Sequence, residues 1–275
     1  LFIRKKYSYH LLIILFFFTF YNSFSQHYHQ RIKHYSLEDG LSQTTILDLL
    51  KDSSGFIWIG TQGGLNRFDG QQFRHFKPIS EDTTSISNTY INKLLEDKNG
   101  NIWIGTLNGL NIYNPQSDVF NKVSLSTFKN EIITSLEVQE NGTIWVGTRK
   151  TGVHRLLPLG QNKFQKENFL STTSITSLFI DSQKQLWIGG FEGAVFILNL
   201  NNSEIELKPL HLNIQGRVQA FYRTEKKLLI GTEVGFYIYD LITKNVKRVN
   251  LNEQHQGLTK QVTEFLDAGN FGVWV

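Results

Sequence analysis

Residues 91–106 read INKLLEDKNGNIWIGT, and the same pattern recurs along the chain. In each copy an apolar segment leads through a short turn into a second apolar segment that contains a tryptophan or, once, a leucine. The copies cover residues 46–61, 91–106, 133–148, 175–190 and 218–232, and a last one opens at Val262. Successive tryptophan positions lie 45, 42, 42, 42 and 45 residues apart. A period in the low forties is typical of one four-stranded blade of a β-propeller.

Each copy predicts a β-hairpin whose second strand is buried on both faces. Asn99-Gly100 between two apolar runs indicates a hairpin, because both residues accept a positive φ. In the strand that follows, Ile102 and Ile104 face one side and Trp103 faces the other. Such a strand must be covered twice, and each blade of a propeller lies between two others. We therefore expect the recurring tryptophans to pack between blades: Trp58, Trp103, Trp145 and Trp187.

Two further strands complete each unit. Asn108-Gly109 turns the chain into a third strand at residues 110–113, and a less regular outer strand follows. The expected outer strands cover residues 73–76, 119–123, 164–169, 205–210 and 246–251. No helical period stands out between residues 46 and 275. The sequence therefore predicts an all-β fold, an incomplete β-propeller of four-stranded antiparallel blades.

Five full blades and the start of a sixth are expected, within a ring of seven. The blades begin near residues 46, 91, 133, 175, 218 and 262. Residues 32–35 are expected to form an outer strand that would complete the last blade and close the ring.

The first 25 residues predict a secretory signal peptide. Three basic residues at positions 4–6 precede an apolar run at residues 11–20, and Ser25 stands at a suitable cleavage site. The alternative is a membrane anchor, but the run is shorter than the roughly 20 residues of a spanning helix. Cleavage would leave residues 26–275 as the N-terminal part of a propeller in the periplasm. Contact with the inner membrane would then come from regions beyond residue 275.

The composition argues against several partners and chemistries. The chain has 28 Lys plus Arg against 24 Asp plus Glu, and most of the excess lies in the first 25 residues. A nucleic-acid surface is therefore not expected. Because the chain has 0 cysteines, disulfides and thiol chemistry are excluded.

No catalytic residue, cofactor or metal site is predicted. The glycine pairs at 63–64 and 189–190 lack the Lys-Ser/Thr and the helix of a phosphate loop, so we interpret them as turns. His27 and His29 have no further metal ligand at a suitable spacing. The recurring tryptophans would also suit a quinone-dependent dehydrogenase, but no repeated carboxylates converge on one point. Three residues at equivalent positions are interpreted as turn formers rather than acid–base groups: Asp69, Asn114 and Asp240.

Two stretches carry a resemblance to a known family: LEDGLSQTTILDLLKDSSGFIWIGTQGGLNRFDGQQFRHF at residues 37–76 and EDKNGNIWIGTLNGLNIYN at residues 96–114. They resemble the two-component regulator propeller repeat of Gram-negative bacteria, and the resemblance extends over roughly residues 28–275. It implies a periplasmic propeller ahead of a membrane helix and a cytoplasmic output, commonly a histidine kinase. It also implies oligosaccharide ligands and a possible homodimer. This sequence departs from the pattern at Leu229, which replaces Trp, and at residues 182–184, where Asp and Gly are missing.

Polar residues gather where the repeat varies most, in the loops that follow the second strands. In propeller topology these loops share one face with the loops that enter the first strands. Amides, charged groups and an aromatic ring suit a hydroxyl-rich ligand, although variable loops can also be merely solvated. The predicted ligand-binding residues are Gln62, Tyr90, Asn108, Arg149, Lys150, Glu192 and Glu233. The entering loops add Asn88, Thr89, Asn130, Glu131, Thr173, Ser174, Gln215 and Arg217.

Three functions follow from these features. The leading hypothesis is a sensor module that binds a small molecule or oligosaccharide for a two-component signalling protein. The second is a secreted propeller scaffold that docks another protein. The third is a propeller lyase or dehydrogenase, for which the sequence offers no catalytic constellation.

Overall fold

The computed structural model describes residues 33–123, 128, 130–160, 163–202, 206–249, 261–267 and 273–274. The chain divides into two compact units, Leu1–Tyr35 and Ser36–Val275, and every strand belongs to the second. The signal peptide predicted over residues 1–25 and the histidines at 27 and 29 lie outside the described residues. The strand expected at residues 32–35 is not formed over its described part, residues 33–35. A strand forms only where its backbone groups find hydrogen-bonding partners.

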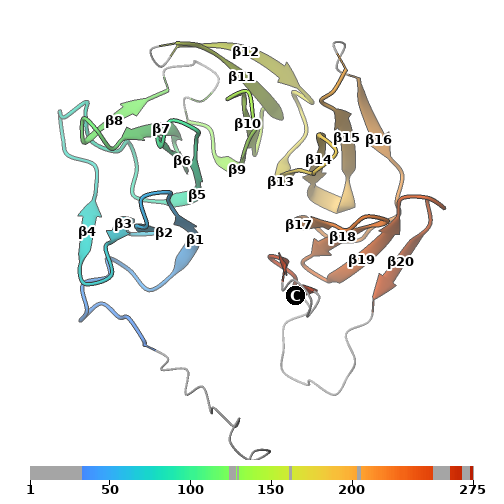
Figure 1. The fold of residues 1–275 in the computed structure, drawn as a ribbon, viewed down its shortest axis with the longest axis horizontal. Helices are drawn as coiled ribbons and strands as arrows, with labels where there is room; N and C mark the ends of the chain where they lie inside the picture. The colour runs from blue at the N-terminus through green and yellow to red at the C-terminus, as the bar shows by residue number, and fades with distance from the viewer. Residues whose placement is uncertain are drawn as a thin grey trace, which may run out of the picture. The chain divides into compact units, whose positions relative to one another are not determined.

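The second unit contains five four-stranded antiparallel sheets, here called blades 1 to 5, in which the strands pair in sequence order (Figure 1). Blade 1 comprises β1 (Ile46–Lys51), β2 (Ile57–Thr61), β3 (Gly64–Phe68) and β4 (Phe73–Phe76). Blade 2 comprises β5 (Ile91–Glu96), β6 (Ile102–Thr106), β7 (Gly109–Asn114) and β8 (Val119–Lys122). Blade 3 comprises β9 (Ile133–Val138), β10 (Ile144–Thr148), β11 (Val153–Gly160) and β12 (Lys163–Phe169). Blade 4 comprises β13 (Ile175–Ile180), β14 (Gln185–Gly190), β15 (Val195–Asn199) and β16 (Leu207–Leu210). Blade 5 comprises β17 (Val218–Arg223), β18 (Lys227–Thr232), β19 (Gly235–Asp240) and β20 (Val246–Val249).

A two-stranded sheet of β21 (Leu266–Asp267) and β22 (Val273–Trp274) follows blade 5. Over the described ranges there is no α-helix, and one short 3₁₀ turn, η2 (Phe191–Gly193), connects β14 to β15. The predicted all-β propeller of four-stranded antiparallel blades is therefore confirmed.

Consecutive blades contact one another through their inner strands, β1 with β5, β5 with β9, β9 with β13 and β13 with β17. The glycine of the second strand lies against a branched residue of the next repeat, which in blades 2 to 5 is the first residue of the inner strand. A Cβ atom added at Gly105 would lie only 2.6 Å from Cγ2 of Ile133. Ile133 itself is fully buried. A Cβ atom added at the equivalent glycines 60, 147, 189 and 231 would lie 2.9, 2.9, 2.5 and 2.8 Å from side-chain atoms of Ile91, Ile175, Val218 and Val262. Only a residue without a side chain allows this approach.

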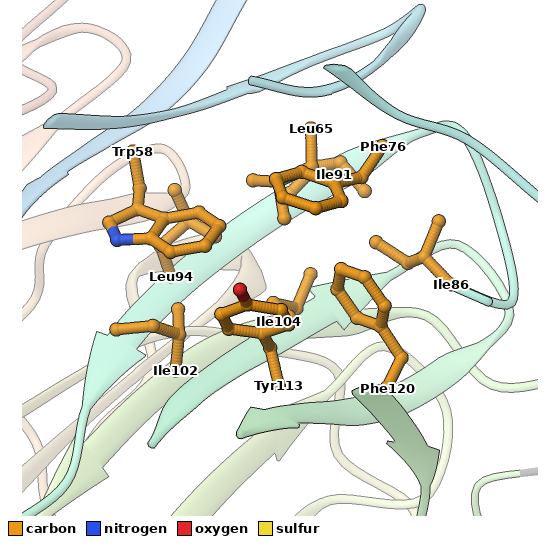
Figure 2. Close-up of a cluster of buried hydrophobic side chains, with 10 residues drawn as sticks. All are labelled: Trp58, Leu65, Phe76, Ile86, Ile91, Leu94, Ile102, Ile104, Tyr113 and Phe120. Atoms are coloured by element: carbon orange, nitrogen blue, oxygen red, sulfur yellow. The ribbon is translucent and has the colours of Figure 1, made fainter. Parts of the chain in front are cut away.

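Aromatic side chains fill the wider, outer part of the gap between blades. Between blades 1 and 2, the Trp58 ring lies 5.7 Å from the Phe76 ring and 5.1 Å from the Tyr113 ring (Figure 2). Phe120 of the neighbouring blade closes the cluster against Phe76 at 5.3 Å. The four recurring tryptophans are each at most 2% exposed and lie in four separate clusters: Trp58, Trp103, Trp145 and Trp187. Their interpretation as residues that pack between blades is confirmed.

Each of these tryptophans also donates its indole N–H to the residue six positions earlier, which directly follows the first strand. Trp58 bonds Asp52 at 2.7 Å, and Trp103 bonds Asp97 at 2.9 Å. In blade 3 the acceptor is Gln139, at 3.0 Å from Trp145. The same carboxylates accept backbone N–H groups of the turn, as Asp97 does from residues 99 and 101. One side chain thus fixes both the hairpin turn and the buried indole, and a buried N–H without an acceptor would cost about 1–3 kcal/mol.

Blade 4 keeps the acid that the sequence pattern had suggested was missing. Asp181 accepts the indole N–H of Trp187 at 2.8 Å, so only the glycine is absent from residues 182–184. Lys184 takes its place with φ 58°, where Gly100 has φ 76°. The position requires a left-handed backbone, which is unfavourable for a residue with a Cβ atom.

Blade 5 has a shorter hairpin turn and lacks the hydrogen bond between an indole N–H and the turn. Its turn closes with Thr224 N donating to the carbonyl O of Lys227 at 2.8 Å, so the turn is one residue shorter than in the other blades. Leu229 stands at the tryptophan position. Arg223 instead reaches back to blade 4, where its guanidinium pairs with the fully buried carboxylate of Asp181. A charge-assisted bond between blades therefore accompanies the missing tryptophan.

The turns between third and fourth strands are held by the three residues interpreted as turn formers. Asp69 Oδ1 accepts the N–H groups of Gln71 and Gln72, each at 2.8 Å. Asn114 and Asp240 accept two backbone N–H groups in the same way. These bonds lower the pKa values of the Asp69 and Asp240 carboxyl groups. Their role as turn residues is confirmed.

The contact of Gly105 with Ile133 predicts a specific coupling between blades 2 and 3. Gly105→Ala should lower the free energy of unfolding by ~1–3 kcal/mol, because the new methyl group overfills the contact. In a double-mutant cycle measured by urea denaturation, adding Ile133→Ala should cost less in the Gly105→Ala background than in the wild type. Ile133→Val retains Cγ2, so it should show no such relief. Additive effects of Gly105→Ala and Ile133→Ala would contradict the proposed contact.

The strained turn of blade 4 predicts a stabilising substitution. Lys184→Gly should raise the free energy of unfolding by about 1 kcal/mol, because glycine adopts a positive φ without steric cost. Lys184→Ala is the matched control, since it removes only the exposed 3.3 Å ion pair with Glu140 and keeps the strain. That control should change stability by less than ~0.5 kcal/mol. Equal effects of the two substitutions in urea denaturation would show that the backbone of this turn is not strained.

Candidate ligand-binding rim

The loops predicted to share one face do lie together, and they are called the rim here. In blade 2 the backbone N–H of Leu107, after the second strand, donates to the carbonyl O of Tyr90, before the first strand, at 3.3 Å. The same bond joins Arg149 to Ile132 in blade 3 at 3.1 Å. Blades 4 and 5 repeat it, with Phe191 N to Ser174 O at 3.4 Å and Glu233 N to Arg217 O at 3.3 Å. In each of these four blades, the loop after the second strand is thus hydrogen-bonded to the loop that enters the first strand.

A buried threonine shapes the loop after the second strand in four blades. Thr106 Oγ1 donates to the carbonyl O of Gly109 at 2.9 Å and accepts the N–H of Asn108 at 3.0 Å. Thr61, Thr148 and Thr232 make the same bond to a glycine carbonyl. In blade 4 the position is Gly190, and the loop forms the 3₁₀ turn η2 with Glu192 at φ 57°. The rim therefore differs most in blade 4.

The third strands hold the entering loops, and this was not foreseen from the sequence. Asn66 of β3 is fully buried, and its Oδ1 accepts the N–H of Ser42 at 2.9 Å. Asn111 of β7 does the same for Ser87 at 3.1 Å. In blade 5 the hydroxyl of Tyr237 accepts the N–H of Gln215 at 3.1 Å. A lone polar residue in an apolar third strand, as in GLNRF and GLNIY, is the signal that could have revealed these anchors.

His154 occupies this anchor position in blade 3. Its ring is fully buried, lies edge-on to Phe128 of the entering loop at 5.2 Å, and places Nε2 2.9 Å from Thr151 Oγ1. Burial lowers the pKa of His154 to about 4. The imidazole is therefore neutral near pH 7 and packs as a structural group, without the charge or access of a catalytic base.

Two of the predicted rim residues, Gln62 and Asn108, hydrogen-bond to the neighbouring blade. Gln62 Nε2 of blade 1 donates to the hydroxyl of Tyr90, in the loop entering blade 2, at 3.4 Å. Asn108 Oδ1 of blade 2 accepts the N–H of Asn130, in the loop entering blade 3, at 3.0 Å. These polar side chains bridge the blades and remain partly exposed.

Arg149, Lys150 and Glu192 are exposed and have no ion-pair partner among the residues that the structure describes. The backbone beneath them is well held, because Oε1 of the buried Glu131 accepts the N–H groups of Lys150 and Ile132, each at 3.1 Å. Blade 3 therefore presents two free cationic side chains on a fixed loop.

Glu233 belongs to a group that spans blades 4 and 5. Its Oε2 lies 3.6 Å from Nη2 of Arg217, and the guanidinium of Arg217 lies 5.4 Å from the centre of the Phe191 ring. The structure thus brings Phe191, Arg217 and Glu233 together, whereas Glu192 forms no ion pair with this group among the described residues. Both charged side chains remain about 40% exposed, at 39% and 44%.

The opposite edge of the sheets carries a separate cavity. It has a volume of about 320 Å³ and lies between the hairpin turns of blades 2 and 3, with Asp97, Trp103, Asn141 and Phe164 among its lining residues. The turns between first and second strands and the loops of the rim are at opposite ends of each strand, so this cavity is distinct from the rim. The sequence analysis did not predict it.

The described ranges contain neither a cluster of potential metal ligands nor a helix that could cross a membrane. No group of three His, Cys, Asp or Glu side chains gathers at a distance suited to a metal ion there. Within the same ranges no helix has the length and apolar character to cross a bilayer.

Three repeats of the chain match a known protein family. The model of the two-component regulator propeller family matches residues 40–63, 85–108 and 170–192. The three matches cover the entering loop, the first hairpin and the rim loop of blades 1, 2 and 4. A relative named histidine kinase P4, from Formosa agariphila, is 40% identical over 75 residues, which is 27% of this chain and 6% of the kinase.

Solved structures share the fold. The extracellular domain of a B. thetaiotaomicron protein described as a hybrid two-component system, BT3049, aligns with a TM-score of 0.57 and 23% identity over 88% of this chain and 40% of that domain. The corresponding domain of BT4673, from the same organism, aligns with a TM-score of 0.58 and 21% identity over 86% of this chain and 37% of that domain. This chain thus spans less than half the length of the sensor proteins that it matches.

The fold alone is shared with enzymes as well. Virginiamycin B lyase from Staphylococcus aureus aligns with a TM-score of 0.60 and 10% identity over 77% of this chain and 71% of the lyase. The repeats, by contrast, match one family at three places along the chain. Three repeats of this propeller domain therefore match the two-component regulator propeller family, and its fold resembles the extracellular domains of two-component sensors.

Proposed function

We propose that this propeller is the extracytoplasmic ligand-sensing module of a two-component signalling protein and that its ligand is a glycan. The observation that carries the proposal is the match of three blades to the two-component regulator propeller family. The relative named as a histidine kinase and the fold shared with extracellular sensor domains support the same assignment. They also favour it over a lyase, whose likeness rests on the fold at 10% identity.

The rim is the part of the domain that we assign to ligand binding. It combines amides at Gln62 and Asn108, an aromatic ring at Tyr90 and unpaired cations at Arg149 and Lys150 on loops fixed by buried residues. Amides and guanidinium groups hydrogen-bond to hydroxyl groups, and aromatic rings pack on the apolar faces of sugars. Because the loops are held from below, little conformational entropy is lost when a ligand binds.

A pair of variants on the two faces tests this site. Tyr90→Ala combined with Arg149→Ala should weaken binding of the full chain to an array of neutral, amino and uronic-acid oligosaccharides roughly tenfold, because a stacking ring and a hydrogen-bond donor are lost. Lys98→Ala combined with Lys163→Ala, at the opposite cavity, is the matched control and should bind as the wild type does.

Thermal unfolding should be nearly unchanged in both pairs, since all four residues are at least partly exposed. Weaker binding in the control pair with normal binding in the rim pair would move the site to the opposite cavity. A wild-type chain that binds none of these oligosaccharides would contradict the glycan assignment.

We further propose that residues 1–25 direct export and are removed. Protein isolated from a periplasmic fraction should begin at Gln26 when its N-terminal peptide is analysed by mass spectrometry, because Ser25 provides the small residue that signal peptidase requires. Replacing Ser25 by a bulky residue, as in Ser25→Phe, should leave the precursor uncleaved. Recovery of the wild-type chain in the cytosol with residues 1–25 intact would contradict this proposal.

A further inference from the structure

Blade 4 presents an exposed aromatic ring at the rim, and its position follows from one missing side chain. Gly190 replaces the threonine that shapes this loop in the other blades, and the chain instead forms η2. Phe191, the first residue of η2, is 41% exposed although it is a large apolar side chain. Single exposed apolar side chains are common on protein surfaces, so the groups beside this ring decide what it can contact.

The loop that carries Phe191 is firmly seated. A Cβ atom added at Gly193 would collide with the carbonyl O of Ile214, in the segment that enters blade 5. Ile214 is itself buried, and the neighbouring Gln215 is held by the hydroxyl of Tyr237 at 3.1 Å. The loop of blade 4 therefore packs closely against the segment that enters blade 5, and this contact fixes the position of Phe191.

A cationic group of blade 5 lies over one face of the ring. The guanidinium of Arg217 lies 5.4 Å from the ring centre, and Glu233 holds it through a 3.6 Å ion pair and a 3.3 Å bond from the backbone N–H of Arg217. Arg217 Nε and the nearby Ser174 Oγ are buried without a hydrogen-bond partner among the described residues. Both atoms are buried, so a ligand at the rim would meet the exposed part of the Arg217 guanidinium, whose side chain is 39% exposed.

We propose that Phe191, Arg217 and Glu233, called the platform below, form a subsite that stacks one pyranose ring of the glycan. The apolar face of the sugar packs on Phe191, while Arg217 donates to its hydroxyl groups and Glu233 accepts from them. The inference rests on the glycan function proposed above and assigns it to one sector of the rim. The other exposed apolar residue of the rim loops, Leu107 of blade 2, is 37% exposed but has no flat face and no charged pair beside it.

The platform is tested by single substitutions in the full chain, with the same array of neutral, amino and uronic-acid oligosaccharides. For each oligosaccharide that the wild type binds, Phe191→Ala should weaken the binding roughly tenfold. Phe191→Trp should restore binding, because it keeps a flat ring. Ile242→Ala is the control, because this exposed apolar residue lies in the turn between β19 and β20, at the opposite end of the strands from the rim, and it should leave affinity unchanged. Arg217→Lys keeps the charge but loses the planar fork, and should weaken binding at least threefold.

The outcomes separate the platform from the proposed function. If the wild type binds and Phe191→Ala binds equally well, the platform is wrong while glycan sensing stands. If Phe191→Ala and Ile242→Ala weaken binding equally, the effect is not specific to a stacking ring at the rim, and the platform is again wrong. If the wild type binds no oligosaccharide, the glycan function itself fails and the platform fails with it. Unchanged thermal unfolding of Phe191→Ala, which removes an exposed ring, shows that any loss of binding is local.

Discussion

The whole domain depends on the close approach of one blade to the next at a glycine. In each of the five blades the second strand carries this glycine, and an isoleucine or valine of the following repeat packs against it. A propeller is narrow at its inner strands and wide at its outer strands, so the inner contact must be made with almost no side-chain volume. Farther out, tryptophan and phenylalanine fill the widening gap, as between Trp58 and Phe76. The sequence pattern is therefore a gradient of side-chain size along the radius of each interface.

Most of this architecture could be predicted from the sequence because it repeats. The period, the two-sided burial of the second strand and the turn glycines are all local signals, and each appears several times. The exceptions are places where one copy compensates in its own way. The indole of Trp187 finds its acceptor at Asp181, which a reading of residues 182–184 overlooked, and Arg223 bonds the same carboxylate from the next blade. A contact between residues 42 positions apart leaves no trace in a local pattern.

The sequence could predict which loops form the rim, but it could not predict which side chains contact one another there. Propeller topology alone places Gln62, Tyr90 and Arg149 on one face, and the backbone bonds between the loops agree with that placement. The grouping of Phe191 with Arg217 depends on how blade 5 is rotated against blade 4, which sequence cannot specify. The buried anchors Asn66 and Asn111 were missed for another reason, since a single polar residue within a strand is usually interpreted as solvent-facing.

The glycine contact also makes the trailing surface of one repeat fit the leading surface of any other. Each repeat offers a glycine to its successor and an isoleucine or valine to its predecessor, so a junction between two repeats that were not originally adjacent retains the same inner contact. Gain or loss of one repeat by recombination in register would therefore create no new kind of interface. The rim residues stand outside this contact and can diverge from copy to copy. The residues that must stay uniform to keep the fold are thus separate from the residues that can change to bind new ligands.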